Sequence, residues 1–255
     1  MSTAAPGRAP GRRRLAGFAV FIVALTVLFL ALSIWQFVRL GEKEVAVAAV
    51  ASRRDLPPMA FPGQALWDDL DASSLDYRPV TVTGTLRADN TVRVFASLGQ
   101  EARGQHSGPG YWLMTPLQLA GGGSVFINRG FVPEAVADDW STGLAEVGVT
   151  VTGLARLPEP GNSFTPAADQ ADRIDWIRSI DRLASLVDPA LAPFAPVYVD
   201  APAGAAGALP QGGETLLEIA NRHLEYALTW LALALLTPLL FGLWLRHQSR
   251  GGRDG

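Results

Sequence analysis

The chain has 255 residues, of which 49% are hydrophobic and only 18% are charged, below the ~25% usual in soluble domains. This imbalance indicates that part of the chain lies in lipid. The absence of cysteine excludes disulfides, thiolate metal sites, cysteine nucleophiles and covalent attachment of a c-type haem. A formal net charge of −3 argues against a nucleic-acid-binding protein.

Two uncharged stretches predict transmembrane helices, one from Leu15 to Ile34 and one from Tyr226 to Leu245. At ~1.5 Å per residue, each is long enough to cross a hydrocarbon core of ~30 Å. Pro238 lies inside the second stretch, and we expect it to kink that helix, which membrane helices tolerate. A signal peptide is the alternative for the first stretch, because Ala31-Leu32-Ser33 resembles a cleavage site. We favour a retained helix, since the apolar run is long for a signal peptide and Trp35 follows as an interfacial anchor.

Basic residues flank both predicted spans on their outer sides. Arg8, Arg12, Arg13 and Arg14 precede the first span, and Arg246, Arg250 and Arg253 follow the second. The positive-inside rule therefore predicts that the tails, residues 1–14 and 246–255, are cytoplasmic. The intervening segment, residues 35–225, carries an excess of acidic side chains and is expected to be extracytoplasmic in a multi-pass protein of the cell membrane.

The segment between the spans alternates apolar and polar residues over short runs, which is typical of strands. Predicted strands are Pro79–Leu86, Thr91–Ala96, Tyr111–Leu119, Ser124–Asn128, Val147–Ala155 and Val197–Asp200, and predicted short helices are Gln64–Ser73 and Ser179–Val187. Gly121 to Gly123 reads as a hairpin loop. We therefore predict a membrane α+β protein, in which two transmembrane helices flank one mainly antiparallel-β extracytoplasmic domain, either an open sheet or a small barrel with a few helices.

Only three histidines are available for chemistry. His247 follows the second span among arginines, and His106 lies in a glycine-rich loop that we expect to be solvated. His223 precedes the second span. On a continuous helix it shares one face with Tyr226 or Ala227 and with Trp230. An imidazole there is a candidate axial ligand of a membrane-soluble haem, and the alternative is an interfacial polar residue bonded to headgroups or to the domain.

Other candidate sites have weaker support. No Ser-His-Asp arrangement can be argued, because His106 and His223 lie in such different contexts. Asp68, Asp69 and Asp71 form a carboxylate cluster on the first predicted short helix, which we interpret as a solvated face. Arg129 ends an apolar strand and is suited either to binding an anion such as a haem propionate or to an ion pair with a carboxylate of the domain.

These features together resemble the Surfeit locus family of cytochrome c oxidase assembly factors. Short motifs in order and spacing carry the resemblance from Trp35 to Trp230. They are Trp35-Gln36 with Arg39, Tyr77-Arg78-Pro79-Val80, Gly110-Tyr111-Trp112 with Thr115-Pro116-Leu117, Val125 to Pro133, Val151-Thr152-Gly153 with Arg156, Pro196 to Val199, and Asn221 to Trp230. Two positions depart from the family pattern, since Arg222 replaces an expected Asn and Glu225 an expected Gln. These two residues have the spacing to form an ion pair on the helix.

The resemblance implies a non-enzymatic assembly factor that binds haem a transiently and aids its delivery to the catalytic subunit of a haem-copper cytochrome c oxidase. The machinery that makes haem a and the lipid bilayer are the other implied partners. By the same resemblance, His223 is the axial ligand of the haem iron. Tyr226 and Trp230, from the same predicted helix face, are further candidate cofactor-binding residues. Arg129 or Arg222 is then a partner for the propionates.

Two other functions remain open from the sequence. The first is a haem-free membrane scaffold that stabilises assembly intermediates of the oxidase. The second is an enzyme of the haem pathway, against which the lack of redox ligands and of a credible acid–base pair argues.

Overall fold

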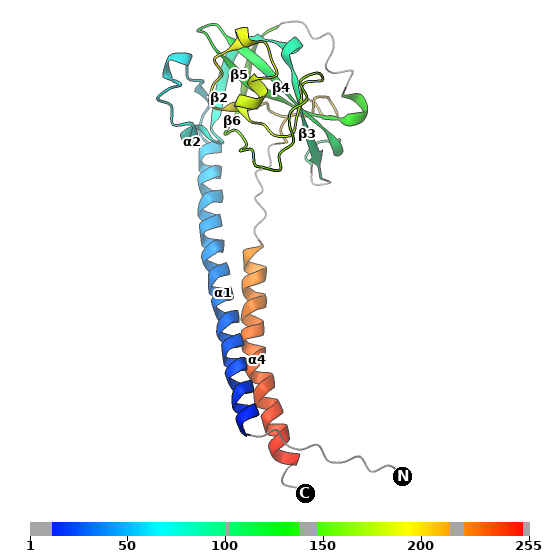
Figure 1. Cartoon of the computed structure of the whole chain (residues 1–255). Helices are drawn as coiled ribbons and strands as arrows, with labels where there is room; N and C mark the ends of the chain where they lie inside the picture. The colour runs from blue at the N-terminus through cyan, green and yellow to red at the C-terminus, as the bar shows by residue number, and fades with distance from the viewer. Residues whose placement is uncertain (1–11, 100–101, 138–146, 215–221, 252–255) are drawn as a thin grey trace. The chain divides into compact units, whose positions relative to one another are not determined.

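The computed structural model describes residues 12–99, 102–137, 147–214 and 222–251. The chain forms two compact units (Figure 1). The helical unit contains Met1–Ala48 and Glu218–Gly255, and the β unit contains Ala49–Leu217.

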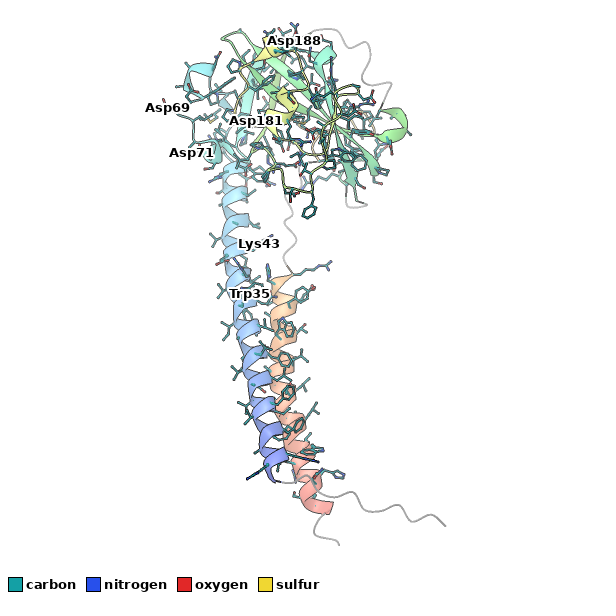
Figure 2. All side chains as sticks on the ribbon, in the orientation of Figure 1. Trp35, Lys43, Asp69, Asp71, Asp181 and Asp188 are labelled. Atoms are coloured by element: carbon teal, nitrogen blue, oxygen red, sulfur yellow. The ribbon has the colours of Figure 1, made fainter. Side chains whose placement is uncertain are left out.

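Two long helices dominate the first unit, α1 (Arg12–Arg54) and α4 (His223–Gly251). Both are long and apolar enough to cross a membrane, over Arg13–Arg54 and His223–Arg250. Their leucine- and alanine-rich composition favours helix, and Pro238 lies within α4 without ending it. The helix α1 continues well past the predicted end of the first span at Ile34. Trp35 and Lys43 project from this continuation (Figure 2).

Aromatic side chains join α1 to α4 near the ends of the two helices that carry the termini. The Phe18 ring meets Phe241 edge-on at 5.4 Å and Trp244 at 5.8 Å between ring centroids. Edge-to-face pairs at such separations are favourable beyond the area that they bury. The two helices are therefore packed against each other as an antiparallel pair.

The β unit is built from one eight-stranded sheet. Its strands are β1 (Met59–Ala60), β2 (Pro79–Leu86), β3 (Val92–Leu98), β4 (Gly108–Leu119), β5 (Ser124–Pro133), β6 (Val147–Arg156), β7 (Ile174–Asp175) and β8 (Tyr198–Asp200). The order is β1-β2-β6-β8-β5-β4-β3-β7, and β2 also pairs with β4. The pairings of β2, β6, β8, β5 and β4 therefore close a ring, so the small barrel is the correct one of the two predicted architectures.

The sheet is mixed, although its longest pairings are antiparallel. Strand pairs β2–β6, β3–β4 and β4–β5 are antiparallel over most of their length. Strand pairs β1–β2, β3–β7 and β5–β8 are parallel over two residues each. The prediction of a mainly antiparallel domain is thus refined to a mixed sheet. Its short parallel contacts arise where distant segments return to the barrel.

All six predicted strands are present, several of them longer than predicted. Strand β4 begins at Gly108, ahead of the predicted Tyr111, because Gly108 and Pro109 pair with the end of β3. Gly121 to Gly123 is the predicted loop, and Gly122 and Gly123 have positive φ values of 96° and 68°. Tertiary pairing extends strands into residues of low strand propensity.

The predicted helix over Gln64–Ser73 is wrong as a single element. It divides into a 3₁₀ helix, η1 (Gln64–Leu66), and a short α-helix, α2 (Ala72–Leu75). The Asp71 carboxylate accepts a hydrogen bond from Ser73 N at 3.0 Å and caps α2, so the chain starts a new helix there. Bonds from the Ser73 side chain and backbone lower the pKa of this carboxyl.

The carboxylate cluster is a solvated face with one capping residue. Asp68, Asp69 and Asp71 are all exposed, and Figure 2 shows Asp69 and Asp71 on the outside of the β unit. Within the described part of the chain, no group of three or more His, Cys, Asp or Glu side chains has the geometry to hold a metal ion.

The remaining helices are short. The predicted helix at Ser179–Val187 appears as α3 (Ile180–Ala184), and three 3₁₀ turns, η2 (Ala88–Asn90), η3 (Glu134–Val136) and η4 (Pro189–Leu191), complete the described elements. Ile180 and Leu183 of α3 pack into a cluster with Phe126 and Tyr198. Phe126 is fully buried and stacks on Phe194 at 4.6 Å. This helix therefore covers a part of the core that the strands leave open.

Replacing Phe126 with alanine is expected to lower the free energy of unfolding of the β unit by ~3–5 kcal/mol, because the buried ring would leave a cavity. Phe164 is 91% exposed, so Phe164→Ala is the matched control and should change stability by less than ~0.5 kcal/mol. Chemical unfolding of the full chain in detergent, followed by near-ultraviolet circular dichroism, measures both. Equal losses in the two variants would contradict the assignment of Phe126 to the core.

Candidate functional site

His223 is the first residue of α4, and its side chain is half-buried against α1. Its Nδ1 atom lies 2.7 Å from Oε1 of Gln36, which is only 9% exposed. A residue of α1 therefore holds the imidazole at the end of α4 nearest the β unit in sequence.

Two further contacts follow along the same helix faces, about one per helical turn. Ser33 Oγ donates to the carbonyl of Ala227 at 3.0 Å, and both residues are buried. The rings of Phe29 and Trp230 stack at 5.6 Å. With Gln36 and His223, these residues follow an i, i+4, i+7 spacing on antiparallel helices, so each residue meets its counterpart in turn. We call these three contacts the interhelical ladder.

The ladder shows which residue, Tyr226 or Ala227, shares the helix face of His223 and Trp230. His223 and Trp230 share a face as predicted, and the residue between them is Ala227, which is fully buried. Tyr226 is 53% exposed and therefore lies away from α1. Sequence reasoning missed Gln36 and Ser33 as partners of this face. The Trp35-Gln36 motif of the family resemblance was the one feature of the sequence that pointed to Gln36.

Arg222 directly precedes α4 and is exposed. Its carbonyl accepts a hydrogen bond from Tyr226 N at 3.2 Å, in the first turn of the helix. Arg222 and Glu225 are both described, and no ion pair forms between them, so the pairing suggested by their spacing does not occur. The Arg222 guanidinium is thus an exposed cation next to His223.

Arg129 lies on β5 in the β unit, within a β-bulge. Asn128 pairs with Met114 and Phe131 with Trp112, so Arg129 and Gly130 together oppose one residue of β4. Gly130 has a φ of 130°. A Cβ atom there would lie 2.4 Å from the backbone carbon of Gln211, so only glycine fits this bulge. Bulges of this kind bend a strand and redirect its side chains.

The Arg129 side chain is half-buried, and no hydrogen bond or ion pair within the described residues compensates its charge. Its Nη1 atom is inaccessible and has no hydrogen-bond partner. None of the described carboxylates forms an ion pair with it, so the ion pair considered from the sequence is absent. Burial lowers the pKa of Arg129. A buried cation of this kind is suited to an anionic or carbonyl ligand.

Two other arginines of the β unit, Arg156 and Arg178, are compensated by carboxylates. Arg156 lies 3.2 Å from Asp76 and 3.5 Å from Asp200, whose carboxylate also accepts a hydrogen bond from Asn128 at 2.8 Å. Arg178 pairs with Glu159. Burial disfavours ionisation of Glu159, but the charge and hydrogen bonds of Arg178, with a smaller contribution from Arg156, together lower the pKa of this carboxyl. These ion pairs are structural, in contrast to Arg129.

The remaining histidines lie in unlike surroundings. His247 is exposed near the end of α4. The prediction of a solvated loop is wrong for His106, which is half-buried with an inaccessible Nε2 atom. Its backbone N–H donates to Oε1 of Gln211, and its carbonyl accepts from Nε2 of Gln211. These two hydrogen bonds to the Gln211 amide attach the His106 loop to the barrel.

Comparison with known proteins identifies one family. The model of the SURF1 family matches residues 23–235. The SURF1-like protein of Monosiga brevicollis is 28% identical, over 96% of this chain and 92% of the relative. The SURF1-like protein of Drosophila melanogaster is 29% identical, over 94% and 82%. Surfeit locus protein 1 of Homo sapiens is 27% identical, over 90% and 77%. The matched region includes the whole interhelical ladder and the β unit.

The contrast between Arg129 and Arg156 can be measured. Arg129→Leu removes an uncompensated buried cation, so we expect an unchanged or higher midpoint of thermal unfolding for the β unit. Arg156→Leu leaves the buried Asp200 without its cation, and we expect a loss of ~3–5 kcal/mol. Both are compared by circular dichroism of the full chain in detergent. A loss for Arg129→Leu as large as that for Arg156→Leu would show that Arg129 is structural.

Proposed function

Because the chain belongs to the SURF1 family, a family of cytochrome oxidase assembly factors, we propose that it binds haem a through His223 and aids delivery of this haem to the catalytic subunit of a haem-copper oxidase. The observation that carries the proposal is the half-buried His223 imidazole at the start of the apolar helix α4, where it contacts Gln36 of α1. Imidazole is a common axial ligand of haem iron. The protein acts here as a carrier and not as a catalyst.

The surroundings of His223 suit an amphipathic, lipid-soluble cofactor. Trp230 lies below His223 on the face toward α1, and Tyr226 lies exposed on the same turn of α4 as His223. The apolar helices provide an environment for the farnesyl tail of haem a. The exposed Arg222 provides a charge for a propionate at the membrane interface.

Arg129 is the second candidate for a propionate partner. Its inaccessible Nη1 atom, which has no hydrogen-bond partner, supports a role in binding an anion. It is assigned to the propionates as part of this proposal. Bound haem a would supply an iron atom for a single protein ligand, and a single axial bond suits a carrier that must release its cargo.

The proposed carrier spans the membrane twice. Arginines outside both apolar stretches support cytoplasmic termini, and the acidic segment between the helices supports an extracytoplasmic β unit. In this orientation His223 lies near the outer interface of the membrane.

Replacing His223 with alanine is expected to abolish the haem a absorption band of protein purified in mild detergent from cells that make haem a. The exposed His247 provides the matched control, so His247→Ala should retain the band. An unchanged circular dichroism spectrum shows that both variants are folded. Unchanged haem content in His223→Ala would refute the ligand role, whereas a folded wild type that co-purifies with oxidase subunits but has no haem band would favour the scaffold function.

The proposed topology is testable because the chain has no cysteine. Phe164→Cys places one thiol on the exposed surface of the β unit, and Ser249→Cys places one near the end of α4. A membrane-impermeant maleimide should label Phe164→Cys in intact spheroplasts and Ser249→Cys only after lysis. The reverse pattern would show that the orientation is inverted.

A further inference from the structure

Gln36 is a polar residue that is buried between two exposed apolar neighbours on α1. Its neighbours Trp35 and Phe37 are 50% and 42% exposed, whereas Gln36 is 9% exposed. In an apolar helix pair a polar side chain is expected to face the partner helix, because burying an amide without a hydrogen bond is unfavourable. The burial of Gln36 therefore requires a specific partner, and the His223 imidazole is that partner.

We infer that Gln36 is a positioning residue, which holds His223 in the tautomer with the proton on Nδ1, so that Nε2 is the nitrogen that binds iron. The inference rests on the proposed function in so far as His223 binds haem. It adds to that function the identity of the ligating atom and of the residue that selects it.

The chemistry of the two groups determines the direction of the hydrogen bond. The amide oxygen Oε1 can only accept, so the Nδ1 atom at 2.7 Å must donate. A neutral imidazole carries one proton, and a proton on Nδ1 leaves the lone pair on Nε2. Metal-binding histidines commonly donate their second ring N–H to such an acceptor, which fixes the tautomer and the orientation of the ring.

The interhelical ladder keeps Gln36 in place. Ser33, one turn before Gln36, is hydrogen-bonded to the carbonyl of Ala227, and Phe29 stacks on Trp230. These contacts set the register of α1 against α4 without contacting the imidazole. Because the acceptor is an uncharged amide, it orients the ring without adding a charge to an apolar pair of helices.

The tautomer can be observed without haem. The chain has only three histidines, so long-range ¹H–¹⁵N spectra of ¹⁵N-histidine-labelled apoprotein in detergent resolve them, and His223→Ala assigns the signals of His223. At a pH where the ring is neutral, we expect the wild type to carry the proton on Nδ1. Gln36→Leu should lose this preference, and Ser33→Ala should retain it. A wild-type ring with its proton on Nε2 would overturn the inference.

Haem titration of the same variants measures the consequence. Gln36→Leu is expected to weaken haem a binding by roughly 10- to 100-fold, the usual effect of losing the hydrogen bond behind a metal ligand. Ser33→Ala, which removes an interhelical hydrogen bond of the same ladder, should bind within about two-fold of wild type. Equal weakening in both variants would assign the effect to helix packing and overturn the positioning role, as would full affinity in Gln36→Leu.

The two measurements separate this inference from the proposed function. If the wild type binds no haem, the proposed function fails, and the apoprotein spectra still decide whether Gln36 selects the tautomer. If the wild type binds haem and His223→Ala does not, while Gln36→Leu keeps both the tautomer and the affinity, the proposed function stands and the inference fails.

Discussion

Satisfaction of polar groups within an apolar helix pair is the constraint on which the helical unit depends. A buried hydroxyl, amide or imidazole without a partner is costly where water is excluded. Ser33 and Gln36 each meet this requirement through α4, at the Ala227 carbonyl and at His223. These directional contacts require one register between α1 and α4, which apolar packing alone leaves less specified.

The same constraint is met in the β unit by different means. Closing β2, β6, β8, β5 and β4 into a ring pairs strand edges that would otherwise be open. Closure also brings Asp76, Arg156 and Asp200 together from distant parts of the chain, so that their charges compensate one another, and Asn128 adds a hydrogen bond to Asp200. The short parallel contact between β5 and β8 places Asp200 beside Asn128.

Arg129 stands apart from this pattern. The bulge at Arg129 and Gly130 follows Asn128, whose side chain is hydrogen-bonded to Asp200. The Nη1 atom of Arg129, in contrast, has no partner among the described residues. Removing part of a charged group from water lowers the stability of the fold when no ion pair offsets the lost hydration. This unpartnered atom is the observation on which the proposed anion-binding role of Arg129 rests. His223 differs from Arg129, because its Nδ1 atom has a hydrogen-bond partner in Gln36.

Much of the architecture follows from local properties of the sequence. Two uncharged stretches predict the helices because a span requires about twenty apolar residues, and alternation predicts six strands because successive side chains point to opposite faces. The shared face of His223 and Trp230 follows from helical periodicity alone. The division of the predicted helix at Gln64–Ser73 was missed, because the Asp71 cap competes locally with helix continuation.

The sequence by itself determined the class of the protein, its two apolar helices, most of its strands and the histidine at the start of α4, because each depends on residues close together in the chain. Only the tertiary structure decided the ring closure, the half-buried position of His106 and the pairing of His223 with Gln36. Gln36 and His223 are 187 residues apart, and no local pattern specifies which residue of α1 meets which residue of α4. That choice is made by the packing of the two helices as a whole, through the register in which all of their buried polar groups find partners.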